Sequence, residues 1–199
     1  MRARSLLLLL LPCLALLSAP SANAAVPNPA TSHVDPCLVL CPAGDFTFHV
    51  VVRDIANVPV AGASVVVNLC NCPSVHLCSG PCDVLVTSDA AGNASFQIKG
   101  GGLCPGGTAS VTADGVILAT RTVASPDQDG DLSVTSADIA TISGKLLLPY
   151  DPGADLNCDG LVNSNDVAIA SSHIDHNCQG IVPTEGQSWG KVKARVKLP

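Results

Sequence analysis

An internal repeat at an offset of 28 residues constrains this chain more than any other feature. Residues 134–140, Val-Thr-Ser-Ala-Asp-Ile-Ala, align with residues 162–168, Val-Asn-Ser-Asn-Asp-Val-Ala. Each block covers the end of a polar loop whose positions are counted from Asp127 in the first copy and from Asp155 in the second. Oxygen-bearing side chains occupy positions 1, 3, 5 and 12 of each loop. These side chains are Asp127, Asp129, Asp131 and Asp138 in the first copy and Asp155, Asn157, Asp159 and Asp166 in the second. The chain therefore contains two copies of one polar loop in the same register.

The spacing of these oxygens suits a calcium ion. Calcium takes roughly six to eight oxygen ligands, and a short loop supplies them from side chains at these positions and from a backbone carbonyl at position 7. Position 7 is Ser133 or Leu161, and position 9, Thr135 or Asn163, can hold a bridging water. We predict two calcium sites. Their ligands are Asp127, Asp129, Asp131, Ser133 and Asp138 in the first site and Asp155, Asn157, Asp159, Leu161 and Asp166 in the second.

The two loops differ at position 6, where the chain must turn sharply. The second loop has Gly160 there, whereas the first has Leu132, with Gly130 two residues earlier. A leucine lacks the free access to positive φ that glycine has. We therefore predict that the first site is the weaker of the two.

Charge supports a bound cation. Residues 127–175 contain nine Asp and a single basic residue, Lys145. Such a density of carboxylates is either disordered by self-repulsion or neutralised by a cation. The duplicated ligand spacing favours the cation.

Helical spacing follows each loop. Ile139, Ile142 and Leu146 in the first copy correspond to Val167, Ala170 and Ile174 in the second, at i, i+3 and i+7. We predict two short helices that pack on each other through these stripes.

Two loop-helix units with Asp at position 12 resemble the type I dockerin family. The resemblance covers residues 127 to about 178 and is strongest over residues 155–166. It implies a compact helical pair that binds two calcium ions and docks to a cohesin-like protein domain or a cell-surface scaffold. In that family, positions 10 and 11 help to select the partner. These positions are Ser136, Ala137, Ser164 and Asn165 here.

Residues 1–24 have the pattern of a secretory signal peptide. Arg2 and Arg4 precede an apolar run, residues 6–17, and small residues follow at 21–24. The run is shorter than the roughly 20 residues that a membrane-spanning helix needs. We expect an exported protein, extracellular or at the cell surface, without a membrane span.

The region between the signal peptide and the repeat has the pattern of short strands. Residues 25–44 form a Cys- and Pro-rich leader, and from residue 45 apolar side chains alternate with polar ones. Six short runs separated by turns predict a small antiparallel β-sandwich over residues 45–124. Residues 52–54, 59–63 and 87–96 resemble bacterial Ig-like and carboxypeptidase-regulatory-like modules. The expected fold class is thus mixed and mainly β: an Ig-like sandwich, the dockerin-like unit at residues 125–179 and a basic tail at 180–199.

Nine cysteines follow the signal peptide, and in an exported chain disulfides are their default fate. An odd number leaves one thiol unpaired or bonded to another molecule. We expect Cys158 and Cys178, the only cysteines of the repeat region, to pair. A second interpretation of the cysteine cluster at residues 70–82, with His76, is a zinc site, but its spacing favours disulfides. His173 and His176 could form one face of a transition-metal site, although histidine also suits the end of a helix.

No catalytic signature occurs in the sequence. The leading hypothesis is a non-enzymatic, calcium-dependent docking or surface-assembly protein that binds no nucleic acid. One alternative is a purely structural extracellular protein that calcium makes rigid. Another is an accessory subunit of a polysaccharide-degrading assembly, although Trp189 and Tyr150 are the only Trp and Tyr for binding sugars.

Overall fold

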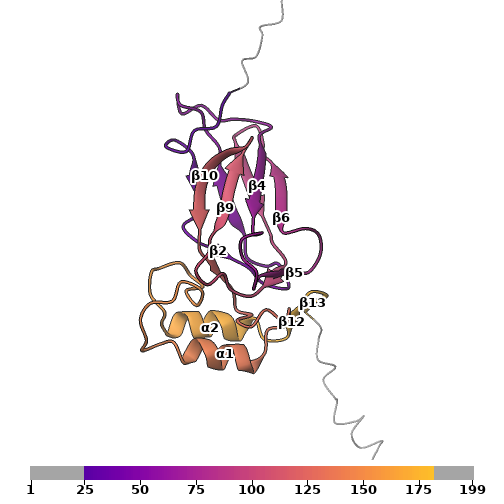
Figure 1. Ribbon diagram of the computed structural model, residues 1–199, viewed down its shortest axis with the longest axis vertical. Helices are drawn as coiled ribbons and strands as arrows, with labels where there is room; N and C mark the ends of the chain where they lie inside the picture. Colours follow the sequence, from indigo (N-terminus) through magenta and orange to yellow (C-terminus); the bar gives the residue numbers. More distant parts are fainter. Residues whose placement is uncertain (1–24, 182–199) are drawn as a thin grey trace, which may run out of the picture.

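The computed structural model describes residues 25–181, so the predicted signal peptide, residues 1–24, and residues 182–199 of the predicted tail lie outside the described residues. Within residues 25–181, two β-sheets stand at one end of the molecule and a pair of short helices at the other (Figure 1). The mainly β character predicted from the sequence is confirmed.

Two antiparallel sheets form the β part. The first has the order β1-β3-β7 and consists of β1 (His33–Val34), β3 (Phe48–Val51) and β7 (Asn93–Phe96). The second has the order β10-β9-β4-β6 and consists of β10 (Val116–Arg121), β9 (Ala109–Ala113), β4 (Ser64–Asn68) and β6 (Asp83–Thr87). The six strands predicted over residues 46–119 are all present. Turn residues flank them, and all except β7 contain β-branched residues.

Alternating burial places one face of each sheet against a shared core. In β4, Val65 and Val67 are fully buried while their neighbours are half-exposed. On the opposite sheet, Val50 is fully buried, and Phe48 lies opposite Phe96 with ring centroids 6.3 Å apart. These side chains belong to one hydrophobic cluster. Burying each such valine or phenylalanine stabilises the fold by about 1.5–3 kcal/mol.

The hairpin between β9 and β10 turns at Asp114 and Gly115, as predicted. Both residues have positive φ, +47° and +80°, which a two-residue turn of the type I′ kind requires. The turn fixes the register of the two strands, in which Val116 lies opposite Ala113.

Residues 25–44 lie against both parts of the molecule. β1 pairs with β3, and β2 (Leu38–Val39) pairs in parallel with β11 (Val123–Ala124), just before the first acidic loop. Leu38 and Leu40 are fully buried in the core. This segment therefore connects the sheets with the helical unit. The remaining short strands form two pairs: β5 (His76–Leu77) with β8 (Gly100–Gly101), and β12 (His176–Asn177) with β13 (Gly180–Ile181).

The helices, α1 (Ser136–Ser143) and α2 (Ser164–Ser172), pack on each other. Ile142 and Ala170 are fully buried in a second, smaller hydrophobic cluster. The last residue of each predicted stripe, Leu146 or Ile174, lies beyond its helix and is 37% or 41% exposed. The stripes are thus shorter than predicted, because α1 ends at its capping residue Gly144.

Four disulfides join Cys37 to Cys158, Cys70 to Cys82, Cys72 to Cys104 and Cys78 to Cys178. The expected bond between Cys158 and Cys178 is wrong, since each of these residues bonds to a cysteine of the β part. A zinc site at the cysteine cluster is also excluded, because all four of its sulfurs are in disulfides. The odd thiol is Cys41, which is buried.

No helix within residues 25–181 is long and apolar enough to cross a membrane.

Candidate metal centres

The first acidic loop folds around the carboxylate at position 1. Asp127 is fully buried and accepts hydrogen bonds from the backbone N–H groups of Gly130 (2.8 Å) and Leu132 (2.9 Å). Asp129 accepts one from Asp131 N–H at 3.1 Å. Carboxylate oxygens of Asp127, Asp129 and Asp131 lie within 4.8 Å of one another. Three predicted ligands of the first site are therefore brought together.

The second loop repeats these contacts with different residues. Asp155 at position 1 accepts a hydrogen bond from Gly160 N–H at position 6 (2.9 Å), as Asp127 does from Leu132. Asn157 at position 3 accepts one from Asp159 N–H (3.1 Å). The Tyr150 hydroxyl adds a hydrogen bond to Asp155 at 2.8 Å, which has no counterpart in the contacts of Asp127.

The position 5 carboxylate and the position 7 residue are also linked in both loops. Ser133 N–H donates to Asp131 at 2.8 Å, and Leu161 N–H donates to Asp159 at 2.9 Å. Each residue whose backbone carbonyl is a predicted calcium ligand at position 7 is thus hydrogen-bonded to the carboxylate at position 5.

The carboxylate at position 12 closes each loop and begins the helix that follows. Asp138 accepts hydrogen bonds from Gln128 N–H (2.8 Å) and from Thr135 N–H (2.9 Å). Asp166 accepts the equivalent pair from Leu156 and Asn163, both at 2.8 Å. The bond from the position 9 N–H to Asp138 or Asp166 is one half of a capping box at the start of α1 or α2. In the other half, the position 9 side chain accepts a hydrogen bond from a helix N–H. Loop and helix therefore form one unit.

The backbone takes positive φ at positions 4 and 6 of both loops. The first loop has Gly130 at +76° and Leu132 at +69°, and the second has Cys158 at +61° and Gly160 at +82°. The sharp turn predicted at position 6 is confirmed in both copies. A residue with a Cβ is less stable in this conformation by roughly 1–2 kcal/mol, and each loop contains one such residue.

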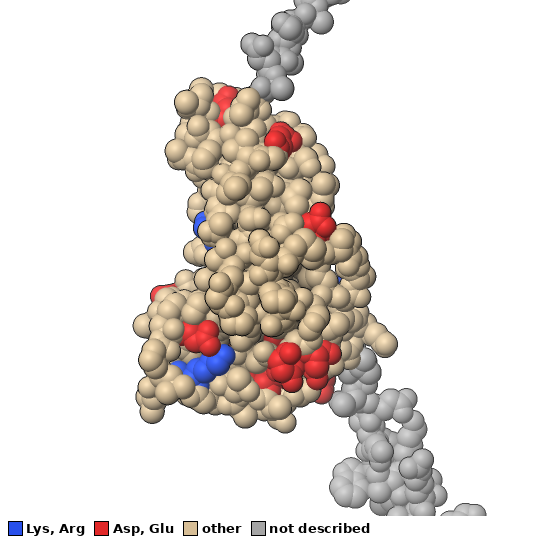
Figure 2. Space-filling model, in the orientation of Figure 1, with Lys and Arg blue, Asp and Glu red and all other residues tan. Residues whose placement is uncertain are grey.

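Four of the predicted ligands are buried carboxylates without a basic partner. Asp127, Asp138, Asp155 and Asp166 are at most 2% exposed, and within residues 25–181 none forms an ion pair with Lys, Arg or His. The nearby Lys145 pairs with Asp151 instead, at 2.8 Å. Acidic side chains gather on the surface of the helical unit (Figure 2).

Burial raises the pKa of Asp127 to about 6 against the opposing effect of its two amide hydrogen bonds, and the negative charges of Asp138 and Asp131 raise it further. Burying an ionised carboxylate is unfavourable unless an opposite charge compensates it. The oxygen-rich donor sets, with no sulfur or nitrogen ligand, fit a hard divalent cation such as calcium.

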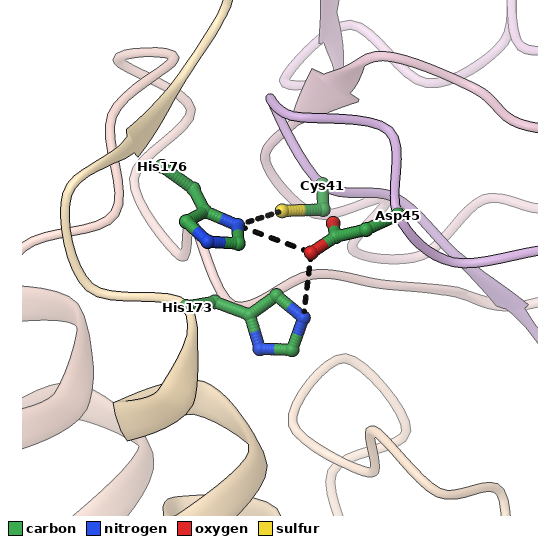
Figure 3. A group of neighbouring side chains, drawn as sticks. All are labelled: Cys41, Asp45, His173 and His176. Carbon is green, nitrogen blue, oxygen red and sulfur yellow. Dashed lines mark hydrogen bonds and ion pairs between the residues drawn. The ribbon is translucent and has the colours of Figure 1, made fainter. Parts of the chain in front are cut away.

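A second cluster of metal-binding side chains lies between the two parts of the molecule (Figure 3). It comprises Cys41, Asp45, His173 and His176, with one ligand atom from each within 4.8 Å of the others. His173 Nε2 and His176 Nδ1 lie 3.1 and 3.2 Å from the same oxygen, Asp45 Oδ2. Cys41 Sγ lies 3.7 Å from His176 Nδ1. Burial raises the pKa of the Cys41 thiol to about 12, although the backbone amide of Ala43 partly opposes this.

Sequence analysis identified the two histidines of this cluster but missed Cys41 and Asp45. Cys41 and His176 are 135 residues apart, and no spacing rule joins them. The only available signal was the odd cysteine count.

No protein-family model matches the chain, and no curated protein or solved structure matches it significantly.

Proposed function

We propose that this protein is an exported, non-enzymatic calcium-binding protein whose helical unit binds two calcium ions. One observation carries the proposal: two loops of different sequence form equivalent hydrogen bonds around buried carboxylates that have no basic partner within residues 25–181. A calcium ion at each loop supplies the missing positive charge. The four disulfides are typical of proteins that fold in an oxidising compartment, outside the cytosol.

Calcium binding in this proposal also stabilises the two helices. α1 and α2 have eight and nine residues, and isolated helices shorter than about 12–15 residues are marginal in water. Asp138 and Asp166 each act as a proposed ligand and as part of a helix cap. An ion that holds these carboxylates in place therefore holds the first turn of each helix.

Thermal unfolding in calcium and in excess chelator tests this proposal. At a free calcium concentration about 100 times the dissociation constant, each occupied site stabilises the folded protein by about 2.7 kcal/mol. We expect a higher melting temperature in calcium and a smaller effect of magnesium, whose stricter octahedral geometry fits a flexible loop poorly. Identical melting curves in calcium and chelator would contradict the proposal.

The second part of the proposal is calcium-dependent docking to a cohesin-like domain or a surface scaffold, as in the dockerins that the repeat resembles. Residues 136, 137, 164 and 165, at positions 10 and 11, are exposed at the starts of α1 and α2. The segment between the helices adds exposed apolar side chains, with Leu147 99% and Leu148 63% exposed. Contiguous exposed apolar surface is typical of interaction sites.

A binding assay on the cell-envelope fraction of the producing organism tests docking. The immobilised protein should retain a partner in calcium and release it in chelator. A double variant, S136D with S164D, should bind two calcium ions but no longer retain that partner. A partner that binds equally well in chelator, or to the double variant, would contradict docking through this surface.

A structural role is a second candidate, because two disulfides fix the helical unit to the β part. Cys37–Cys158 and Cys78–Cys178 join the two parts at separate points. In this case calcium makes an already cross-linked rod more resistant to unfolding, and no partner is needed. Protease resistance that depends on calcium, together with no calcium-dependent partner in the assay above, would favour this role.

A further inference from the structure

The cluster of Cys41, Asp45, His173 and His176 has ligand atoms that converge on one point (Figure 3). Cys41 and Asp45 come from the turn before β3, His173 caps the end of α2, and His176 begins β12. The cysteine and His176 are buried, the His173 side chain is 14% exposed, and the Asp45 side chain is 38% exposed. The cluster is therefore enclosed, with one side open to solvent at Asp45.

The arrangement does not suit a nucleophilic cysteine. In a catalytic triad the nucleophile and the acid contact opposite nitrogens of the histidine ring. Here Cys41 Sγ and Asp45 Oδ2 both face Nδ1 of His176. Cys41 is also fully buried, which leaves a substrate no access to the sulfur. All four ligand atoms instead face one common point, which is the arrangement that a metal ion requires.

Hydrogen bonding at His173 fits the role of a metal ligand. Its Nδ1 lies 2.7 Å from the carbonyl oxygen of Ile169, which can only accept, so Nδ1 carries a proton. In the neutral ring, Nε2 then presents a lone pair to Asp45 Oδ2 at 3.1 Å. Either a proton or a metal ion on Nε2 would join these two acceptors. A bond from the other ring nitrogen to a backbone carbonyl is the usual outer contact of a metal-bound histidine.

Three of the six separations between the ligand atoms are close to those of a tetrahedral zinc site, and all six are within 4.8 Å. With bonds of about 2.1 Å to nitrogen and oxygen and about 2.3 Å to sulfur, zinc separates its N and O ligands by about 3.4 Å and its S and N ligands by about 3.6 Å. The observed separations are 3.1 and 3.2 Å for the two histidines and Asp45, and 3.7 Å for Cys41 and His176. Imidazole, thiolate and carboxylate are all zinc ligands.

Each ligand is held by its surroundings. The ring of His173 stacks on Phe46, with centroids 4.8 Å apart and planes 15° apart. The carbonyl of His176 accepts a hydrogen bond from Val134 N–H at 2.9 Å. Gly44, at φ +77°, closes the turn that brings Asp45 back beside Cys41, and its N–H donates to the Cys41 carbonyl at 2.9 Å. These contacts hold the His173 ring and the backbone around Cys41, Asp45 and His176 in place.

We propose that Cys41, Asp45, His173 and His176 bind one zinc ion that clamps the N-terminal segment to the end of the helical unit. On binding, the Cys41 thiol releases its proton to solvent, a zinc–sulfur bond forms, and no electron is transferred. The site uses none of the acidic-loop ligands, so it does not depend on the calcium proposal. It explains why one cysteine of residues 25–181 stays outside the four disulfides.

The test is zinc and cobalt binding to the disulfide-bonded protein without a thiol reductant. We expect one zinc per chain after dialysis, unchanged in excess calcium. Cobalt in its place should show the thiolate-to-metal charge-transfer absorption of a cysteine ligand. The variants C41S and H173Q should each weaken zinc binding by more than the roughly 10–100-fold typical of losing an outer contact. H33Q, which changes an exposed histidine outside the cluster, should bind zinc as the parent does.

Folding of each variant is checked independently by counting four disulfides by mass spectrometry and by its calcium response. A correctly folded protein that binds no zinc, or a folded C41S that binds it as tightly as the parent, would overturn the proposal. So would zinc that calcium displaces, because that ion would occupy the acidic loops.

Discussion

The two acidic loops reach the same geometry by different means. Both place positive φ at positions 4 and 6, but the glycine is at position 4 in the first loop (Gly130) and at position 6 in the second (Gly160). The remaining left-handed position is taken by Leu132 in one loop and by Cys158 in the other. The hydrogen bonds to the carboxylates at positions 1 and 12 dominate the loop conformation, and the residue that turns the chain is secondary.

The loops differ more in what surrounds them. Cys158 is bonded to Cys37, so the second loop is tied to the N-terminal segment, whereas the first loop contains no cysteine. The first loop has a carboxylate at position 3, Asp129, where the second has the neutral Asn157. The expectation that the first site is weaker stays a prediction, since the strain at Leu132 is matched by comparable strain at Cys158.

The largest expected effect is at position 12. D138A and D166A each remove a buried carboxylate and leave two amide donors without an acceptor, at about 1–3 kcal/mol each. We expect each variant to lose about 2–6 kcal/mol of unfolding free energy in chelator, measured by urea denaturation. It should bind one ion fewer and therefore lose about 2.7 kcal/mol more at a free calcium concentration about 100 times the dissociation constant. The control D83N changes an exposed aspartate of β6 and should change neither quantity. Two variants that each lose both ions would show that the loops are not independent sites.

Removing the disulfide at the second loop should affect the two calcium sites differently. Replacing Cys37 and Cys158 by Ala removes a long cross-link, and we expect a loss of about 2–4 kcal/mol of unfolding free energy. Calcium affinity should fall at one site only. Removing Cys70–Cys82, which lies within the β part, should leave both calcium affinities unchanged. Equal weakening of both sites in the first variant would argue against a local role for the Cys37 bond.

Glycine substitutions test the contribution of backbone strain. L132G should stabilise the protein by about 0.5–1 kcal/mol, because relief of the left-handed strain exceeds the entropy that glycine loses on folding. G160A should destabilise it by about 1 kcal/mol through strain alone, since a Cβ at that position meets no atom within 4 Å. Denaturant midpoints in saturating calcium measure both changes. A destabilised L132G would show that the leucine side chain has a packing role that outweighs the strain.

The smallest effect should come from exchanging the position 3 residues. N157D adds a carboxylate to the second loop, and D129N removes one from the first. We expect calcium affinity to rise a few-fold in the first variant and to fall a few-fold in the second, with smaller changes at high salt because exposed charges are screened. Titrations at two salt concentrations measure this. Changes in the opposite direction would indicate that position 3 does not contact the ion.

Local patterns predicted much of this structure. Strand β4 and the Asp114–Gly115 turn could be predicted from the sequence, because each depends on residues that are neighbours in the chain. The two acidic loops could be predicted because the repeat lies within one short segment. The sequence did not reveal the disulfide partners of Cys158 and Cys178 or the contact between Cys41 and His176. These depend on how distant segments pack. The burial of Leu38 within a Pro-rich leader was missed for the same reason.

Calorimetric titration of the metal-free protein with calcium tests the central claim most directly. Two loops with equivalent cages of buried carboxylates predict two calcium ions per chain, and one ion per chain in D138A and in D166A. No binding at millimolar calcium, by a protein shown to be folded with its four disulfides, would contradict the account.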